Sequence, residues 1–169
     1  MTWYAIYTKP RHEKKVDLAL REKLFETYLP MLTQTRKWKD RKKSVDLPLF
    51  SSYLFVNFDY KLRFNLLDTP GIVKIINFSG EPAEIPEWQI ESLKRILEFP
   101  ETLRPERHFT PGQIVEIIDG PMRGLRGTIV KSKKKDRLVL TIDGIMQSVS
   151  VLVDRSAVKR ILENPSETE

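Results

Sequence analysis

The chain has 169 residues, no cysteine, two histidines, a formal net charge of +6 and a sequence pI near 9.5. The lack of cysteine excludes disulfides and thiolate metal sites, and His12 and His108 lie in separate regions that indicate no metal cluster. No apolar run approaches the roughly 18–20 residues needed to span a bilayer, and no signal peptide is evident, so we expect a cytoplasmic protein without membrane association.

The first hundred residues predict an α+β domain. Residues 2–8 form an apolar, aromatic strand, and residues 11–25 form a helix because Val16, Ala19, Leu20 and Leu24 fall on one face. Further strands are predicted at 28–33, 47–58 and 72–76, and further helices at 61–68 and after Pro86, where Ile90, Leu93 and Leu97 give one apolar stripe. The order β-α-β-β-α-β-α predicts an antiparallel sheet with helices packed on it.

Positive charge is concentrated near the start of the chain. Residues 1–50 carry 12 Lys and Arg against 6 Asp and Glu, which indicates a surface that faces a polyanion. One basic group, Lys9, Arg11, Lys14 and Lys15, begins the first predicted helix. A second, residues 36–43 with Trp38 inside it, is predicted to be a hairpin tip or loop. Both patterns are also compatible with a well-solvated surface.

Beyond residue 99 the pattern changes to strands alone. Residues 100–108 contain prolines and charges without periodicity and are predicted to be a linker. Strands are predicted at 114–118, 127–131, 137–142, 147–152 and 157–162, with residues 131–136 (KSKKKD) as an exposed turn. The predicted organisation is therefore an N-terminal domain at 1–99, a linker at 100–108, an all-β domain at 109–162 and a tail at 163–169.

Spaced glycines mark the start of the second domain. Gly120 and Pro121 predict a tight turn, and Gly124 and Gly127 predict backbone that turns sharply or approaches another strand closely. A nucleotide-binding P-loop is excluded, because Gly127 leads into Thr128, Ile129 and Val130, which favour a strand. Residues 109–130 resemble the KOW motif of small five-stranded barrels found in transcription elongation factors and some ribosomal proteins.

The order of the motifs resembles the NusG family of transcription elongation factors over nearly the whole chain. The stretches that carry the resemblance are Trp3-Tyr4-Ala5-Ile6-Tyr7, residues 48–56 (PLFSSYLFV) and Thr69-Pro70-Gly71-Ile72-Val73. Ser51-Ser52 replaces the family's usual Pro-Gly, and Asp143 stands where housekeeping members tend to carry an aromatic contact for a ribosomal protein. These departures favour a specialised paralog of the RfaH or UpxY type.

The resemblance implies that the first domain binds RNA polymerase at the clamp helices of the large catalytic subunit. The polymerase-binding positions that it implies are Tyr7, Phe50, Tyr53, Phe55 and Phe78. Strand alternation places Tyr53 and Phe55 on one face and Leu54 and Val56 on the other, so the aromatic face could equally be core. The resemblance further implies that upstream or non-template DNA contacts Lys9, Arg11, His12, Lys14 and Lys15.

The implied function is processive elongation or antitermination by a monomer that holds the clamp closed, with the KOW domain free to bind Rho, a small-subunit ribosomal protein or RNA. The alternative is a ribosome-associated or RNA-binding protein that does not act on polymerase. No catalytic cluster or metal motif occurs in the sequence, so neither an enzyme nor a cofactor is expected. Because strand formers alternate and glycines recur after residue 109, we expect this region to be β in the free protein, with the two domains moving independently.

Overall fold

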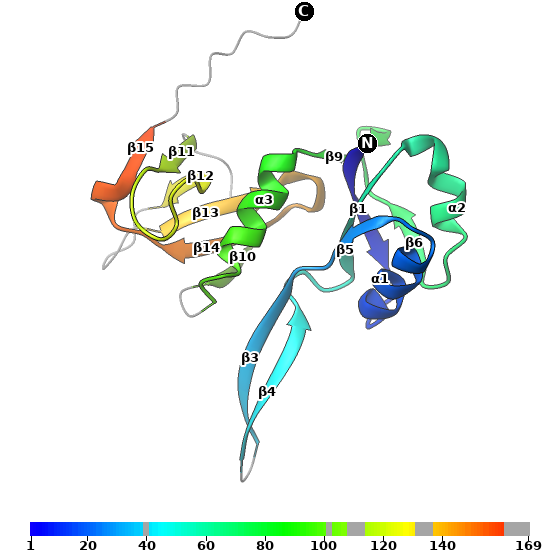
Figure 1. Cartoon of the computed structure of the whole chain (residues 1–169), viewed down its shortest axis with the longest axis horizontal. Coiled ribbons are helices and arrows are strands. Elements are labelled where there is room, and N and C mark those ends of the chain that lie inside the picture. Colours follow the sequence, from blue (N-terminus) through cyan, green and yellow to red (C-terminus); the bar gives the residue numbers. More distant parts are fainter. Residues whose placement is uncertain (39–40, 101–102, 108–113, 131–136, 161–169) are drawn as a thin grey trace, which may run out of the picture. The chain divides into compact units, whose positions relative to one another are not determined.

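The computed structural model describes residues 1–38, 41–100, 103–107, 114–130 and 137–160 (Figure 1). These residues divide between two compact units. The first comprises Met1–Ile90 with Asp143–Ile145, and the second comprises Glu91–Ile142 with Met146–Glu169. The first unit mixes helices and strands and the second is dominated by strands, which confirms the predicted α+β class with an all-β C-terminal part.

The first unit is built around an antiparallel sheet with the order β2-β5-β1-β6, in which β9 also pairs with β1. Two further pairs, β3 with β4 and β7 with β8, form separate two-stranded sheets. The elements in chain order are β1 (Thr2–Thr8), α1 (Glu13–Glu22), β2 (Glu26–Tyr28), β3 (Met31–Trp38), β4 (Arg41–Pro48), β5 (Tyr53–Phe58), η1 (Tyr60–Leu62), α2 (Arg63–Leu67), β6 (Ile72–Ile75), β7 (Asn77–Phe78), β8 (Glu81–Pro82), β9 (Glu84–Ile85) and α3 (Glu87–Ile96), which continues into the second unit.

Helices α1 and α2 pack on one face of this sheet. Alternate residues of β1 and β5 point to that face and meet Val16 and Leu20 of α1 and Leu66 of α2, all fully buried. The strand residues in this core are Tyr4, Ile6, Leu54, Val56 and Phe58. Burying a side chain of this size stabilises the fold by about 1.5–3 kcal/mol. Tyr53 and Phe55 therefore belong to the opposite face, away from the helix-packed core.

Helix α1 ends earlier than the sequence predicted. Leu24, expected on the apolar stripe, has φ +64° and is 93% exposed, while Phe25 is buried in its place. The amide of Phe25 donates to the carbonyl of Leu20 at 3.0 Å, which closes the helix with a left-handed residue before an apolar one. Helical periodicity places Leu24 on the buried face of α1, because it assumes that the helix continues to this residue. The left-handed conformation of Leu24 ends the helix and turns its side chain into solvent.

The strand predicted at 47–58 is two strands. Strand β4 ends at Pro48 and β5 begins at Tyr53, with a turn between them. The turn contains Ser52, whose backbone is held by hydrogen bonds to β1 and α1. Ser51 and Ser52 interrupt the apolar run at this turn, but the apolar and aromatic residues on both sides of them favoured one continuous strand.

The second unit contains a six-stranded antiparallel sheet with the order β10-β14-β13-β12-β11-β15. Its strands are β10 (Arg104–Arg107), β11 (Ile114–Ile117), β12 (Arg126–Val130), β13 (Arg137–Ile142), β14 (Gln147–Leu152) and β15 (Val158–Arg160). Its buried side chains include Leu125, Leu138, Leu140, Val149 and Val151, all at 0% exposure. The prediction of a β rather than a helical C-terminal region is confirmed.

This sheet has one strand more than the five predicted. Residues 104–107, assigned to the linker, form β10 and pair with β14 from Arg104↔Ser150 to Arg107↔Gln147. The sequence RPER has no alternating pattern, and its strand depends on the hydrogen-bonding edge that β14 offers. The predicted domain limits at 99 and 109 stay predictions. The predicted turn at 131–136 and the predicted tail at 163–169 lie outside the described residues and also stay predictions.

Candidate functional site

Tyr7 and Tyr53 form a cross-strand pair on the sheet face that α1 and α2 leave uncovered. They lie opposite each other in the register of β1 and β5, with ring centroids 5.3 Å apart at 60°. Both side chains are only partly buried. An edge-to-face aromatic pair with polar tips supplies a rigid, amphipathic surface, as protein interfaces commonly use.

Three further aromatic residues support this pair from within the unit. Phe55 is fully buried, Phe50 packs edge-on against it with centroids 6.3 Å apart, and Tyr28 of β2 stacks on it at 6.4 Å. We call Tyr7, Tyr28, Phe50, Tyr53 and Phe55 the aromatic face. Of its predicted members, Phe50 and Phe55 therefore form a buried layer, and Tyr7 and Tyr53 are the members that reach solvent. Tyr28 was missed because residues 28–33 show no aromatic alternation.

Phe78 stands apart from this group. It lies on β7, which pairs with β8 rather than with β1 or β5, and it is 69% exposed. Within the described part of the chain no ring contact joins it to the aromatic face. Its proposed role in the same interface stays a prediction.

The turn before Tyr53 is fixed by a buried carboxylate. Glu13 at the start of α1 accepts a hydrogen bond from the Ser52 amide at 2.7 Å, and the Thr8 amide donates to the Ser52 carbonyl at 2.8 Å. Glu13 and Ser52 are 6% and 8% exposed. These contacts join the end of β1, α1 and the start of β5, and so they set the position of Tyr53 relative to Tyr7. Sequence reasoning missed Glu13, which carries no motif of its own.

Ser52 occupies a left-handed conformation, with φ +67°. Such a conformation costs a residue with a Cβ atom about 1–2 kcal/mol. We expect Ser52→Gly to raise the free energy of unfolding of the first unit by about 0.5–1 kcal/mol, once the greater chain entropy of glycine is subtracted. The matched control is Ser51→Gly, at an exposed neighbour without positive φ, which should lower stability. Denaturant unfolding followed by circular dichroism measures both, and equal shifts would contradict the assignment.

The ionisation of Tyr53 reports on the tyrosine pair. Burial raises the pKa of Tyr53 above its usual value, and the nearby Tyr7 raises it further. Because the folded state binds the phenol proton more tightly, this contribution to stability is complete below about pH 10 and is lost as pH rises through the folded pKa. We expect Tyr7→Phe to lower the Tyr53 pKa without returning it to the ordinary value, since burial is the larger cause. A titration followed by NMR of the tyrosine ring carbons measures this, and an unchanged pKa would rule out the coupling.

The predicted nucleic-acid residues gather in the connection from β1 to α1 and in the first turn of α1. Lys9, Arg11, Lys14 and Lys15 are exposed, and His12 is partly exposed with its Nδ1 3.0 Å from the Pro10 carbonyl oxygen. Arg11, three residues after the end of β1, has φ +64°, so the connection turns sharply there before α1 begins. We call the four cations and His12 the basic loop. The Lys14 Nζ donates to the Asp46 carbonyl at 3.2 Å, which ties the loop to the base of the β3–β4 pair.

The glycines of the KOW-like segment have two structural roles, turn formation and close approach to a neighbouring strand. Gly120 and Gly124 have φ of +82° and +84°, and they form the turn that follows β11 with Pro121 exposed beside Gly120. The Gly124 amide closes this turn by donating to the Ile117 carbonyl at 2.7 Å. Gly127 lies instead on β12, where a Cβ atom would stand 2.5 Å from the Val139 carbonyl oxygen. Both roles predicted for these glycines, turning and close approach, are present.

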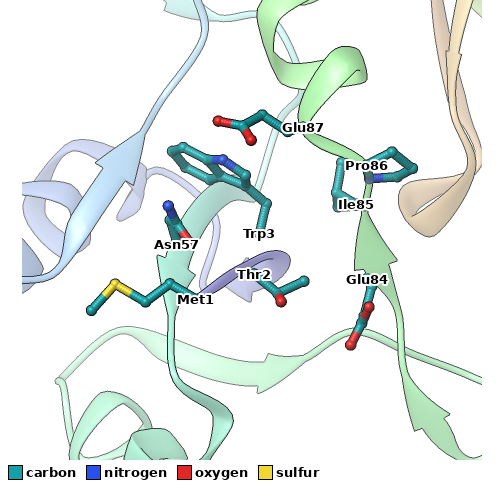
Figure 2. A pocket seen from close by; sticks show the side chains of 8 residues that line it. All are labelled: Met1, Thr2, Trp3, Asn57, Glu84, Ile85, Pro86 and Glu87. Atoms are coloured by element: carbon teal, nitrogen blue, oxygen red, sulfur yellow. The ribbon is translucent and has the colours of Figure 1, made fainter.

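A cavity of about 220 Å³ opens at the start of β1. It is lined by Met1, Thr2, Trp3, Asn57, Glu84, Ile85, Pro86 and Glu87 (Figure 2). Figure 2 shows the Trp3 indole beside Glu87 and Asn57, with Ile85 and Pro86 across from it. None of the predicted site residues lines this cavity, and one of its carboxylates is engaged, because Tyr4 donates to Glu84 at 3.2 Å.

The described ranges contain no group of three histidine or acidic side chains that could hold a metal ion. In the same ranges, none of the helices is long and apolar enough to cross a membrane. The candidate site is thus an aromatic face and a neighbouring cationic loop in one α+β unit. That arrangement is a candidate binding surface with an apolar part and a cationic part.

Comparisons with known proteins identify its family. Residues 1–94 match the family model described as "Transcription termination factor nusG". The "Transcription termination/antitermination protein NusG" of Pseudomonas aeruginosa is 23% identical over 173 residues, covering 94% of this chain and 98% of that protein. The protein of the same name from Xylella fastidiosa is 22% identical, covering 83% of this chain and 88% of that protein.

Solved structures show similar coverage. "Domain interaction in Thermotoga maritima NusG" is 21% identical with a TM-score of 0.48 and covers 95% of this chain and 97% of that chain. "Crystal Structure of MjSpt4:Spt5 complex conformation A" is 19% identical with a TM-score of 0.28 and covers 94% and 97%. On the match over residues 1–94, the chain belongs to the NusG family. It is a transcription termination/antitermination factor and not an enzyme. The specialised-paralog assignment stays a prediction.

Proposed function

We propose that the chain binds RNA polymerase through the aromatic face and promotes processive elongation. The observation that carries this proposal is the Tyr7–Tyr53 pair, which remains partly exposed on the face opposite the helix-packed core. The buried layer of Phe50 and Phe55 fixes the strands beneath it. An interface anchored by preorganised tyrosines loses little side-chain entropy on binding. The clamp helices of the large catalytic subunit are the partner that we assign to it.

The proposed mechanism is mechanical. By bridging the two sides of the polymerase cleft, the first unit favours the closed clamp only as far as it binds the closed state better than the open one. A preference of about 1.4 kcal/mol shifts that equilibrium tenfold and would suppress pausing to a similar extent. The C-terminal sheet is left for a second partner, which we assign to Rho, a small-subunit ribosomal protein or RNA.

Purified core polymerase provides the direct test. The full chain should bind the core enzyme, and an isolated fragment carrying the clamp helices should compete for that binding. Binding to ribosomes or RNA without binding to polymerase would instead support the alternative of a ribosome-associated or RNA-binding protein. In that case the aromatic face would have no assigned partner.

We further propose that the basic loop contacts DNA in the elongation complex. Lys9 and Lys15 are exposed on either side of His12, close in sequence to the Tyr7 end of the aromatic face. Reversing both charges (Lys9→Glu with Lys15→Glu) should weaken binding to an elongation complex and lower the slope of log K against log salt by about 0.9 for each phosphate that is no longer neutralised. The control, Lys61→Glu with Lys159→Glu, makes the same change in net charge at exposed positions elsewhere. A salt slope equal to that of the natural sequence would show that these lysines are merely solvated.

A further inference from the structure

The sheet face that carries Tyr7 and Tyr53 extends to the start of β1, where it ends in the cavity shown in Figure 2. Trp3 lies opposite Asn57 in the same register of β1 and β5, four residues from Tyr7 and Tyr53. Residues an even number apart on a strand point to the same side of a sheet, so Trp3 and Asn57 share the side of the tyrosine pair. At about 3.3 Å per residue, the two cross-strand pairs are roughly 13 Å apart.

A carboxylate lies on either side of the Trp3–Asn57 pair. Glu26 of β2 pairs with Asn57, and its Oε2 accepts a hydrogen bond from the Asn57 Nδ2 at 2.6 Å. Glu87 lines the cavity, and Figure 2 shows its carboxylate beside the Trp3 indole. We call Trp3, Glu26, Asn57 and Glu87 the acidic end. The cavity's other carboxylate, Glu84, is set apart, because its residue pairs with the neighbouring position of β1 and accepts a hydrogen bond there.

No cation among the described residues neutralises the acidic end. Glu26 and Glu87 are exposed, and neither forms an ion pair in that part of the chain. Asn57 positions Glu26 without neutralising it. The dipole of α3 favours a carboxylate at Glu87, but glutamate is disfavoured in a strand such as β2. The opposite end of this face has the opposite sign, since the exposed Lys74 lies opposite Tyr7.

The size and walls of the cavity suit a single side chain. Its volume of about 220 Å³ is below the roughly 300–1,000 Å³ that small-molecule sites usually have. One wall is Trp3, which is 5% exposed and so is held in place, and Ile85 and Pro86 lie across from it. An arginine matches these surfaces, because its planar guanidinium stacks on an aromatic ring while its N–H groups donate to carboxylates. The ammonium of lysine is a compact, strongly hydrated charge without a flat face.

We propose that the acidic end receives an arginine side chain of the protein that docks on the aromatic face. The guanidinium lies against the Trp3 indole and donates to Glu87 and Glu26. This inference rests on the proposed function, because the arginine belongs to the same partner. An ionic contact roughly 13 Å from the tyrosine pair distinguishes one direction of the partner along the face from the reverse. The acidic end therefore supplies orientation to an interface anchored by the tyrosines.

Single capped amino acids test the acidic end without polymerase. The full chain is titrated with N-acetyl-arginine amide, with its lysine equivalent and with its citrulline equivalent, the neutral isostere of arginine. The NMR signal of the Trp3 indole N–H, assigned with Trp3→Phe, follows binding. We expect a dissociation constant on the order of 1–10 mM for the arginine compound and at least about fivefold weaker binding of the other two. Equal binding of citrulline, equal binding of lysine, or no saturable binding of arginine would each overturn the proposal.

A charge-neutralising variant connects the acidic end to the partner. Glu26→Gln with Glu87→Gln removes both charges and keeps a side-chain oxygen that accepts from Asn57. Glu22→Gln with Asp68→Asn is the matched control, because it changes the net charge equally at exposed positions at the end of α1 and directly after α2. We expect the first variant to weaken binding of the arginine compound and of core polymerase at least about tenfold, and the control less than about twofold. Circular dichroism verifies folding.

Core polymerase also separates failure of this inference from failure of the proposed function. If Tyr7→Ala with Tyr53→Ala abolishes polymerase binding while the Glu26 and Glu87 variant binds like its control, the acidic end is overturned and the proposed function stands. If the natural chain does not bind polymerase, the proposed function fails. The arginine then has no assigned partner, and the inference fails with it, even where the titration detects the capped amino acid.

Discussion

Replacing Tyr7 and Tyr53 together by alanine is expected to reduce the affinity for core RNA polymerase more than about a hundredfold while the chain stays folded. Aromatic hot-spot residues typically cost about 2 kcal/mol or more each on truncation, or about thirtyfold in affinity. Since both rings are only partly buried, the cost to folding should be smaller than the cost to binding. Binding to immobilised polymerase, with circular dichroism as the folding check, measures the two effects separately.

Two comparison variants make this result specific. Phe64→Ala removes an aromatic ring that is 69% exposed on α2, away from the aromatic face, and should leave polymerase binding unchanged. Phe55→Ala removes a fully buried ring and should lower the free energy of unfolding by about 3–5 kcal/mol. A folded Tyr7/Tyr53 double variant with normal polymerase affinity would remove the aromatic face from the interface.

Gly127→Ala is expected to destabilise the C-terminal sheet by about 2–3 kcal/mol. The added Cβ atom would lie 2.5 Å from the Val139 carbonyl oxygen on the neighbouring strand, and backbone cannot move aside as a flexible side chain can. Overpacking of this kind typically costs about 1–3 kcal/mol. Hydrogen exchange of the β12 and β13 amides measures the destabilisation, since the repulsion would separate these two strands.

The control for this variant is Gly120→Ala. A Cβ atom added at Gly120 would meet nothing within 4 Å, so the substitution carries only the strain of φ +82°, about 1–2 kcal/mol. A smaller destabilisation at Gly127 than at Gly120 would show that strand spacing near Val139 relaxes freely. The two variants thus separate a steric requirement for glycine from a conformational one.

Elements with a strong local pattern were predictable from the sequence. Thr2–Thr8, Arg137–Ile142 and Gln147–Leu152 have the bounds that alternation and strand propensity gave them. The apolar stripe of the helix after Pro86 was also predicted, and Ile90 and Leu93 are fully buried. In each of these elements the apolar residues recur with the period of the strand or helix, and the same residues are the buried ones. The two agree because each element packs on the core through one face only.

Features fixed by distant contacts were not predictable. The turn at Ser52 depends on Glu13, 39 residues away in the chain, and β10 depends on the edge of β14. Strands β7, β8 and β9 have two residues each, too short to show a period. At the candidate site, the sequence suggested the aromatic positions, yet it could not separate the exposed pair Tyr7 and Tyr53 from the buried Phe50 and Phe55. That distinction depends on contacts between residues distant in the chain, since Tyr28 and Phe50 pack against Phe55 while Tyr7 and Tyr53 pair at the surface.

Strands β3 and β4 pair with each other in a sheet separate from the main one, so the length of this hairpin can change without a change in the main sheet. A strand advances about 3.3 Å per residue, so adding two residues to each strand would carry the end of the hairpin roughly 7 Å further from its base. Adding one residue to each would exchange the two faces of the hairpin beyond the insertion. Because the base is held by Leu32, Asp46 and Lys14, such insertions would leave the main sheet untouched. The reach of this hairpin can therefore change in steps of two residues without a change in the sheet that carries it.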